Sequence, residues 1–322
     1  MASNGKDLDK VPSVLLGYSG LKISRLIVDC SSSLLPDSQA GLHVLKRYYD
    51  RGVNTFEVDS GRSRDSEVTL GKFIRTYKLP RDEIVIMAKI GTVEDSRAHR
   101  HRLNHKYIFD AVQASLARMQ VEYIDVLYCS MLDPETSVSQ MMRALHGVIE
   151  AGFVHYIGMG PCMAYQFHTL QNYAITHNLT PFALSQNNYS LVYREIEHEI
   201  LPTLTHFGVG SIVCTPFMTK YLVKPFPTMN GHKEDPKYAN AGYTVMSIRV
   251  EHIAKRRRVA MATIALAWVL NRDFVHAIVI SPMDSSALLD AASVTLENEE
   301  MAFLEEKYQP VRPIPYPKCR DM

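Results

Sequence analysis

The chain has 322 residues, of which 46% are hydrophobic and 21% charged, and its formal net charge is +1 at pH 7. A charge so close to zero excludes a general attraction to nucleic acid or acidic membranes. We therefore expect a small-molecule partner, no nucleic-acid partner, no membrane partner, and a monomer or weak homo-oligomer.

The first segment, residues 1–12, is polar and has no apolar run, so it predicts a flexible N-terminus and not a secretory signal. No stretch reaches the roughly 18 apolar residues that a membrane-spanning helix requires. The five cysteines lack CxxC spacing, which argues against a disulfide framework or a structural metal site. These features predict a reduced, cytoplasmic protein without a metal centre.

Short apolar or β-branched runs recur along the chain and alternate with longer amphipathic stretches. The expected strands are 25–28, 53–58, 84–89, 123–128, 154–158, 182–186, 209–214 and 277–281. The expected helices include 43–49, 108–119, 138–150 and 263–270. Eight alternations within a length that suits one domain of about 250 residues or more predict a single α/β domain over 1–322, a (β/α)8 TIM barrel and not an open doubly wound sheet.

Three segments fall outside this alternation. Residues 17–22 have turn-forming residues between apolar runs and predict an N-terminal hairpin that closes the bottom of the barrel. Residues 219–243 are rich in Pro, Gly and charge and predict a long loop over the barrel mouth. Residues 310–322 begin with PVRPIPYP, which predicts an extended C-terminal tail over the surface.

Several stretches resemble the aldo-keto reductase superfamily, especially the aryl-alcohol dehydrogenase and versiconal-hemiacetal-acetate-reductase-like branch common in fungal secondary metabolism. The similarity covers roughly residues 14–310 and is strongest in LGYSGLKISRL, SLARMQVEYIDVLY, ALHGVIEAGFVHYIGM, LSQNNYSLVYREIEHEILP and ATIALAWVLNR. The resemblance implies a TIM barrel of aldo-keto reductase type, with its working residues at the carboxyl ends of the strands.

The resemblance also implies a tetrad of Asp, Tyr, Lys and His, in which Tyr protonates the carbonyl oxygen while a nicotinamide delivers hydride. In this chain Glu57 takes the Asp position, Arg62 the Tyr position and Ser130 the His position, whereas Lys89 matches the Lys. A one-residue shortening before Ser66 leaves the register of this segment open by one residue. Arginine is always protonated and has no acceptor, so it cannot serve as the neutral proton donor. The tetrad is therefore expected to be degenerate.

The resemblance places the nucleotide site at Gln186, Lys220, Ser281 and Asp284. Gln186 is retained, but Asp284 stands where a basic residue pairs with the 2′-phosphate of NADPH, and a carboxylate repels that phosphate. Gly160 and Pro161 stand where the family has a polar pair that holds the nicotinamide carboxamide. We expect no bound cofactor, with NADPH or NADH as the alternative.

Strand alternation places Glu57 and Asp59 on one face of the second strand, and Tyr128 and Ser130 on one face of the fourth. Asp29 adds a third carboxylate near the mouth. Crowded carboxylates raise one another's proton affinity, so one can act as an acid and another as a base. The alternative for Glu57 and Lys89 is a residual ion pair that fills the mouth.

The alternatives also stay open for Arg62, which is either a substrate anchor or oxyanion donor or a solvated loop charge. Cys30, Cys129 and Cys214 fall at strand ends, where a thiol nucleophile competes with the more common role of a small apolar filler.

These residues lead to three functional hypotheses. The first is a repurposed barrel that catalyses a non-redox step (isomerisation, dehydration or cyclisation) on a small organic, secondary-metabolite substrate. The second is an NAD(P)H-dependent reductase of an aldehyde or ketone with an atypical site, in which Tyr128, a water or a substrate group supplies the proton. The third is a catalytically silent regulatory or scaffold barrel.

Overall fold

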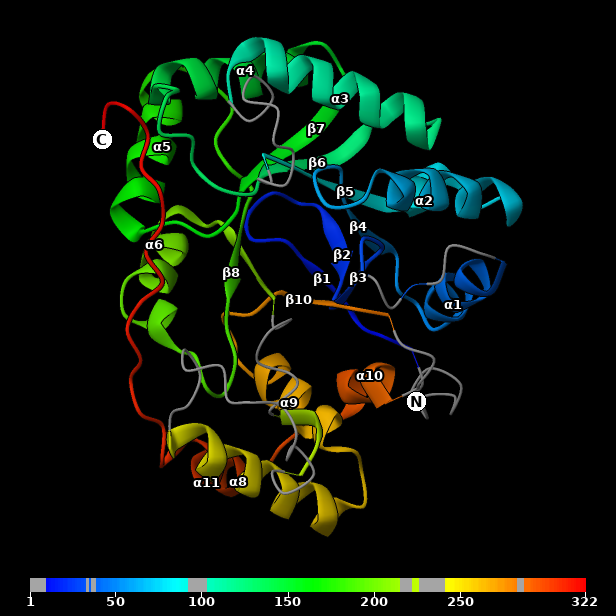
Figure 1. Ribbon diagram of the computed structural model, residues 1–322, viewed down its shortest axis with the longest axis vertical. Coiled ribbons are helices and arrows are strands. Elements are labelled where there is room, and N and C mark those ends of the chain that lie inside the picture. Colours follow the sequence, from blue (N-terminus) through cyan, green and yellow to red (C-terminus); the bar gives the residue numbers. More distant parts are fainter. Residues whose placement is uncertain are drawn as a thin grey trace, which may run out of the picture.

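The computed structural model describes residues 10–32, 35, 39–91, 103–214, 222–225, 241–282 and 287–322. Within them, eight parallel strands close into a barrel in the order β10-β3-β4-β5-β6-β7-β8-β9 (Figure 1). The strands are β3 (Leu26–Asp29), β4 (Thr55–Asp59), β5 (Val85–Ile90), β6 (Ile124–Cys129), β7 (Val154–Met159), β8 (Leu184–Asn188), β9 (Gly210–Cys214) and β10 (Ala277–Ile280). All eight expected strands are present, which confirms the (β/α)8 TIM barrel.

Helices surround the barrel; most of them lie in the connections between successive strands, and the last ones follow β10. The described helices are α1 (Gln39–Asp50), α2 (Arg64–Thr76), α3 (His105–Met119), α4 (Val138–Glu150), α5 (Ala164–Thr176), α6 (Ile200–Phe207), α8 (Ala241–Arg257), α9 (Met261–Leu270), α10 (Ala287–Asp290) and α11 (Asn298–Glu305). None of them is long and apolar enough to cross a membrane.

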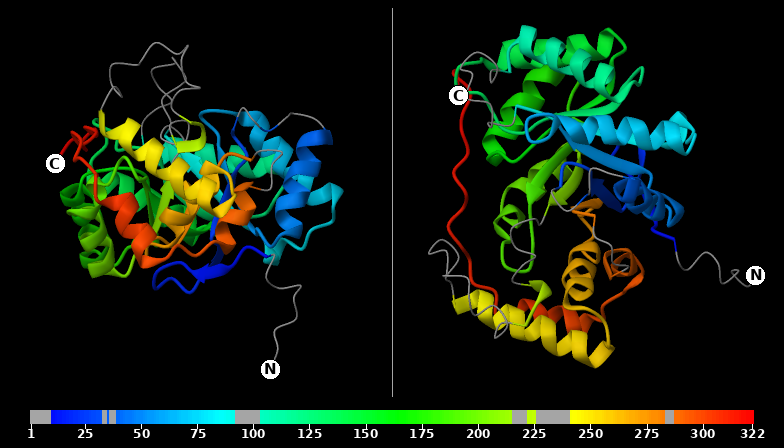
Figure 2. Two further views of the ribbon diagram at one scale, coloured as in Figure 1. Left: turned by 90° about the horizontal axis from the view of Figure 1, so that it is seen from below. Right: turned by 45° about the vertical axis from the view of Figure 1, so that its right-hand side comes forward.

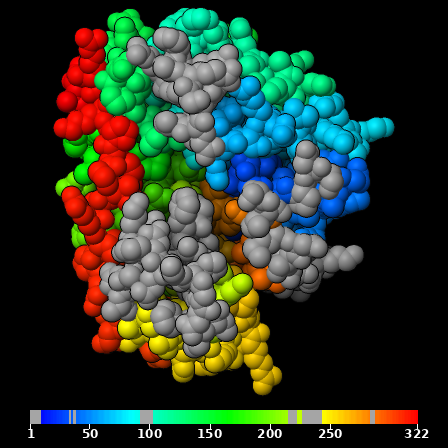
Figure 3. All heavy atoms as spheres, in the orientation of Figure 1, coloured from blue at the N-terminus to red at the C-terminus, as the bar shows by residue number. Residues whose placement is uncertain are grey.

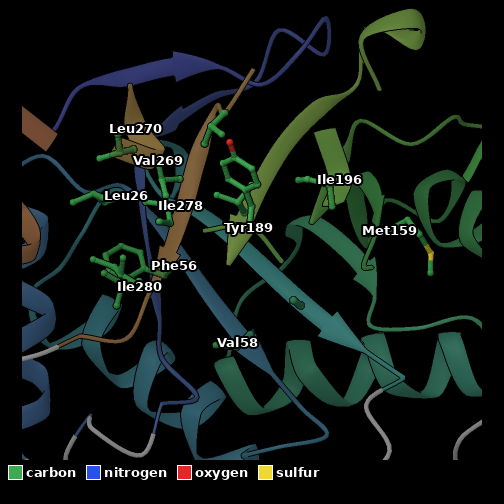
Figure 4. Packing of buried hydrophobic residues seen from close by; sticks show 14 of the residues in the cluster. Leu26, Phe56, Val58, Met159, Tyr189, Ile196, Val269, Leu270, Ile278 and Ile280 are labelled. Atoms are coloured by element: carbon green, nitrogen blue, oxygen red, sulfur yellow. The ribbon is translucent and has the colours of Figure 1, made fainter. Parts of the chain in front are cut away.

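Two apolar clusters hold the barrel together, because each buried strand packs on both faces. The larger cluster lies between strands and helices; Figure 4 shows Leu26, Phe56 and Ile278 from three strands near Leu270 of α9. The smaller cluster fills the barrel interior and includes Ile27, Met87 and Val126. Side chains two residues further along the same strands therefore also point into the barrel, at its mouth.

A hairpin closes the opposite end of the barrel. Strands β1 (Ser13–Leu15) and β2 (Lys22–Ser24) pair antiparallel, and Figure 2 shows them below the barrel in its left panel. Leu16 and Ile23 are fully buried and belong to the interior cluster. The chain turns at Gly17, whose backbone has φ of 52°, and a Cβ there would lie 2.4 Å from the carbonyl oxygen of Gly208. Only glycine permits so close an approach in the left-handed conformation.

The C-terminal segment runs without helix or strand over 308–319. It passes along one flank, from α11 to the region of α4 and α5, as a continuous red band in Figures 2 and 3. The amide N–H of Val311 donates to Glu195, Gln166 donates to the carbonyl of Pro317, and Asp321 accepts a hydrogen bond from the first N–H of α4 at 2.9 Å. The segment is thus attached to three separate connections of the barrel.

Two expectations about the segments differ from the structure. Residues 10–12 do not belong to a flexible N-terminus, because Val11 is buried and its N–H donates to the carbonyl of Arg51 at 2.7 Å. The loop expected over 219–243 ends earlier, since α8 already begins at Ala241. Most of that loop, including Lys220, lies outside the described residues, as do 1–9.

Candidate active site

The register of the first strands brings four charged side chains together at the barrel mouth. Asp29 pairs across from Glu57, and Asp59 pairs across from Lys89. Ile27 and Met87 of the interior cluster lie two residues before Asp29 and Lys89 on the same strands. Glu57 and Asp59 share the register of these residues on β4, so all four charged side chains are on the inner face. Tyr128 follows next to Lys89 on β6. The barrel closure therefore assembles a group that the sequence spreads over one hundred residues.

Glu57 is the centre of a buried hydrogen-bond network. Its Oε2 accepts a hydrogen bond of 2.6 Å from Nε2 of Gln186, which also donates to the hydroxyl of Tyr128 at 3.1 Å. Tyr128 in turn hydrogen-bonds Glu57. Only 4% of Glu57 is exposed, so these bonds compensate the cost of a buried carboxylate. The network fixes Glu57 in place.

Lys89 provides the positive charge beside this network. Its Nζ lies 4.0 Å from Oε1 of Glu57 and 5.4 Å from the centre of the Tyr128 ring. Burial disfavours the ammonium, but the charges of Glu57, Asp59 and Asp29 outweigh burial and raise the pKa of Lys89. Lys89 therefore remains a cation and acts as the counter-ion of Glu57.

Tyr128 is poorly suited to donate a proton. Burial and the neighbouring Glu57 carboxylate raise the pKa of Tyr128 well above its ordinary value. A phenol whose ionised form is so strongly disfavoured is a weak proton donor near neutral pH. Its hydroxyl instead helps to hold Glu57.

Asp29 is the carboxyl group whose protonation changes near neutral pH. Burial and the adjacent Glu57 raise its pKa to about 6, although the N–H of Ser31 and the charges of Arg62 and Lys89 act in the opposite direction. The Ser31 N–H donates to Asp29 at 2.8 Å. A carboxyl group with this pKa can both give and take a proton at physiological pH.

Arg62 faces Asp29 from the loop after β4. Its Nη1 lies 3.9 Å from Oδ2 of Asp29, and 46% of its side chain is exposed. The separation exceeds a hydrogen bond, so the guanidinium keeps most of its five donors for other partners. The structure therefore places Arg62 at the rim and directed toward the carboxylates.

Asp59 has a supporting position. Its Oδ1 accepts hydrogen bonds from the backbone N–H groups of Gly61 and Arg62, at 3.0 and 3.3 Å. These bonds shape the turn that carries Arg62 from β4 toward α2. Asp59 thus positions Arg62, and its carboxylate adds to the negative charge beside Lys89.

Ser130 lies beside this group and outside its hydrogen-bond network. It is 9% exposed, its N–H donates to the carbonyl of Ile90, and its own carbonyl packs against Gly160. Among the described residues, its hydroxyl bonds neither Glu57 nor Lys89. A histidine-like role for Ser130 has no support from this geometry.

The opposite side of the mouth contains Cys214 together with Asn188 and Tyr316, two residues that the sequence did not single out. Cys214 of β9 lies 3.3 Å from the side-chain oxygen of Asn188, and Tyr316 of the C-terminal segment hydrogen-bonds Asn188 and Tyr193. A period-two pattern over LSQNN places Asn188 on the same face as Gln186. Tyr316 has no such signal, because nothing in PVRPIPYP indicates which strand end it reaches.

The three thiols at the strand ends are not activated. Burial raises the pKa of Cys129 and of Cys214 to about 12, in the second case despite the nearby Lys89, and burial together with Asp29 and Glu57 raises that of Cys30 well above its ordinary value. Each thiol therefore remains protonated, and a thiolate nucleophile is disfavoured.

The expected nucleotide site is described only in part. Gln186 lies in the network with Glu57, and Ser281 follows directly after β10 and is partly exposed. Lys220 and Asp284 lie outside the described residues.

The chain is similar to known proteins over most of its length. A model described as Aldo/keto reductase family matches residues 35–309. The protein named "Putative aryl-alcohol dehydrogenase C977.14c" of Schizosaccharomyces pombe is 35% identical, covering 92% of this chain and 95% of its own length. Versiconal hemiacetal acetate reductase of Aspergillus parasiticus is 31% identical, covering 92% and 96%. Aldo-keto reductase dtxS3 of Metarhizium robertsii is 32% identical, covering 94% and 92%.

The names of these relatives describe dehydrogenases and reductases, so they favour the second functional hypothesis, carbonyl reduction, over the first, a non-redox step. The closed barrel and the match over residues 35–309 agree with one another. This chain belongs to the aldo/keto reductase family.

Proposed function

We propose that the protein reduces a small aldehyde or ketone with a nicotinamide cofactor, and that Asp29 supplies the proton that a tyrosine supplies in related enzymes. The relatives' names support the reaction class. The observation that carries the proposal is the Asp29 carboxyl group, with a pKa of about 6, at the mouth beside Glu57 and Arg62.

The residues around Gln186 can hold a nicotinamide ring, but they offer its carboxamide fewer polar side chains than the resemblance to the family implies. Both hydrogen bonds of its amide use Nε2, and no described residue bonds its Oε1, which leaves an acceptor for the carboxamide N–H. Gly160 and Pro161 offer no polar side chain in addition. Gln186 would therefore hold the carboxamide alone, and we expect weak cofactor binding.

A bound nicotinamide would supply the hydride, and the chain's own residues would handle the proton. Asp29, when protonated, would donate to the carbonyl oxygen of the substrate. Arg62 lies close enough to Asp29 to stabilise negative charge that develops on that oxygen. Glu57, fixed by Gln186 and Tyr128, raises the proton affinity of Asp29.

The test is turnover of aromatic aldehydes with NADPH or NADH, together with calorimetric titration of both cofactors. We expect Asp29→Asn to lower kcat by about 100-fold, the lower range for loss of a general acid. Because the protonated form is required, kcat/KM of the wild type should fall as pH rises above about 6. Asp82→Asn, which changes an exposed carboxylate outside the mouth, is the matched control. A protein that binds neither cofactor at millimolar concentration would contradict the proposal.

A non-redox proton transfer is the second candidate, because Asp29 and Glu57 need no cofactor to exchange a proton with a substrate. The two carboxyl groups lie side by side on neighbouring strands, and the pKa of Asp29 is raised to about 6. Turnover of a hydroxy-carbonyl compound without nicotinamide, lost in Asp29→Asn, would select this candidate. Protein that is inactive in both assays would leave the scaffold hypothesis.

A further inference from the structure

The guanidinium of Arg62 has a weakly held counter-ion at the entrance to the site. Oδ2 of Asp29 is 3.9 Å from Nη1 of Arg62, beyond hydrogen-bond distance, while Oδ1 of Asp59 accepts a hydrogen bond from the backbone N–H of Arg62. A guanidinium binds a carboxylate best through two parallel hydrogen bonds of about 2.8 Å. The half-exposed position leaves room for such a partner from solvent.

We propose that Arg62 binds a carboxylate of the substrate, and that this exchange of counter-ions causes Asp29 to take up one proton from solvent. The substrate class is then a carbonyl compound that carries a carboxylate. This inference rests on the proposed function in one respect, that the barrel mouth is the substrate site.

The charges around Asp29 explain the proton uptake. Glu57 faces Asp29 from β4, and Lys89 faces it from β5, while the thiols of Cys30 and Cys214 remain protonated. When a ligand carboxylate engages Arg62, Asp29 loses its nearest cation and gains another negative neighbour. Both changes favour its protonated form.

The consequence for the reaction is that binding of the substrate protonates Asp29, the residue that then donates the proton. Free Asp29, with a pKa of about 6, is mostly ionised at pH 7. Binding a neutral compound leaves it so, whereas binding a carboxylate protonates it beside the carbonyl. The site would thereby select acidic substrates for catalysis as well as for binding.

The test compares 4-formylbenzoate with its neutral methyl ester by isothermal titration calorimetry, without cofactor and again with NADP⁺, neither of which permits reduction. Titrations at pH 7 in phosphate and in Tris report the protons taken up, because the two buffers differ in ionisation enthalpy. We expect uptake approaching one proton per 4-formylbenzoate and none for the ester. The affinity for 4-formylbenzoate should rise by more than about 20-fold from pH 8 to pH 6, because uptake of one proton changes the affinity tenfold per pH unit above the Asp29 pKa of about 6.

Two variants separate the parts of the proposal. Arg62→Gln should remove the preference for the acid over the ester, which we expect to be at least about tenfold in the wild type. Asp29→Asn should bind the acid with the same affinity at pH 6 and pH 8 and without proton uptake. Circular dichroism establishes that each variant is folded.

Equal affinity for acid and ester, binding of the acid unaffected by Arg62→Gln, uptake of no proton, or no binding of either probe would each overturn the inference. Its failure is distinguishable from failure of the proposed function, since these titrations involve no turnover. Acid-selective binding with proton uptake in a protein that never oxidises NADPH would keep the inference and reject the reductase.

Discussion

At the residue scale, the ionised carboxylate of Asp29 lowers the free energy of unfolding. A carboxyl group whose pKa is raised in the folded state binds protons more tightly there than in the unfolded chain, so it destabilises the fold once it must ionise. The penalty is absent below about pH 4, where both states are protonated, and complete above the folded-state pKa of about 6.

We therefore expect Asp29→Asn to raise the free energy of unfolding at pH 8 by roughly 3 kcal/mol, the equivalent of a shift of about two pKa units, and to leave it nearly unchanged at pH 4. Urea unfolding at the two pH values measures the difference. An equal increase in the free energy of unfolding at both pH values would show that ionisation of Asp29 does not destabilise the fold.

The site residues also show where sequence reasoning stops. Glu57, Lys89 and Gln186 could be placed from the resemblance and from strand alternation, because the period of a strand fixes which side chains share a face. Asp29 appeared only as an additional carboxylate. Its importance depends on a register that pairs it with Glu57 across β3 and β4, and hydrogen bonding between strands is not encoded in a local pattern.

At the element scale, the bottom hairpin depends on one backbone approach. Gly17 and Gly20 both have positive φ, of 52° and 75°, yet a Cβ at Gly17 meets the backbone of Gly208 and Gly210 whereas one at Gly20 meets nothing within 4 Å. Both glycines thus have a left-handed backbone, but only Gly20 has room for a Cβ atom.

Gly20→Ala should cost about 1 kcal/mol, the price of the left-handed conformation alone. Gly17→Ala should cost clearly more, because the hairpin must move away from the turn before β9, and chemical denaturation of the two variants gives the comparison. Equal losses would mean that the contact between the hairpin and that turn does not stabilise the barrel.

The C-terminal segment stabilises a helix from outside. Asp321 accepts a hydrogen bond from the N–H of Val138 at the start of α4, where negative charge is favourable. Asp321→Ala should lower the free energy of unfolding by about 1 kcal/mol, and Asp321→Asn, which keeps an acceptor, by less. Urea midpoints measure both, with the exposed Arg312→Ala as control. A midpoint unchanged by Asp321→Ala would mean that water replaces this contact.

At the scale of the whole molecule, the barrel could be predicted from the sequence and the path of its C-terminal segment could not. Eight apolar runs of strand length and the helices between them leave few architectures, as the agreement of residues 138–150 with α4 illustrates. The proline-rich end predicts an extended chain but not its direction. That direction is set by scattered partners such as Glu195, Gln166 and the start of α4.

The closure of the barrel between β10 and β3 has a consequence for synthesis. These two strands lie about 250 residues apart in the sequence. At a translation rate of about 5–20 residues per second, β10 is therefore synthesised on the order of 10–50 s after β3. During that interval the edge of β3 that β10 will cover has no partner, and such an edge is a template for aggregation. The nascent chain is thus exposed to misassembly until almost its entire length has left the ribosome.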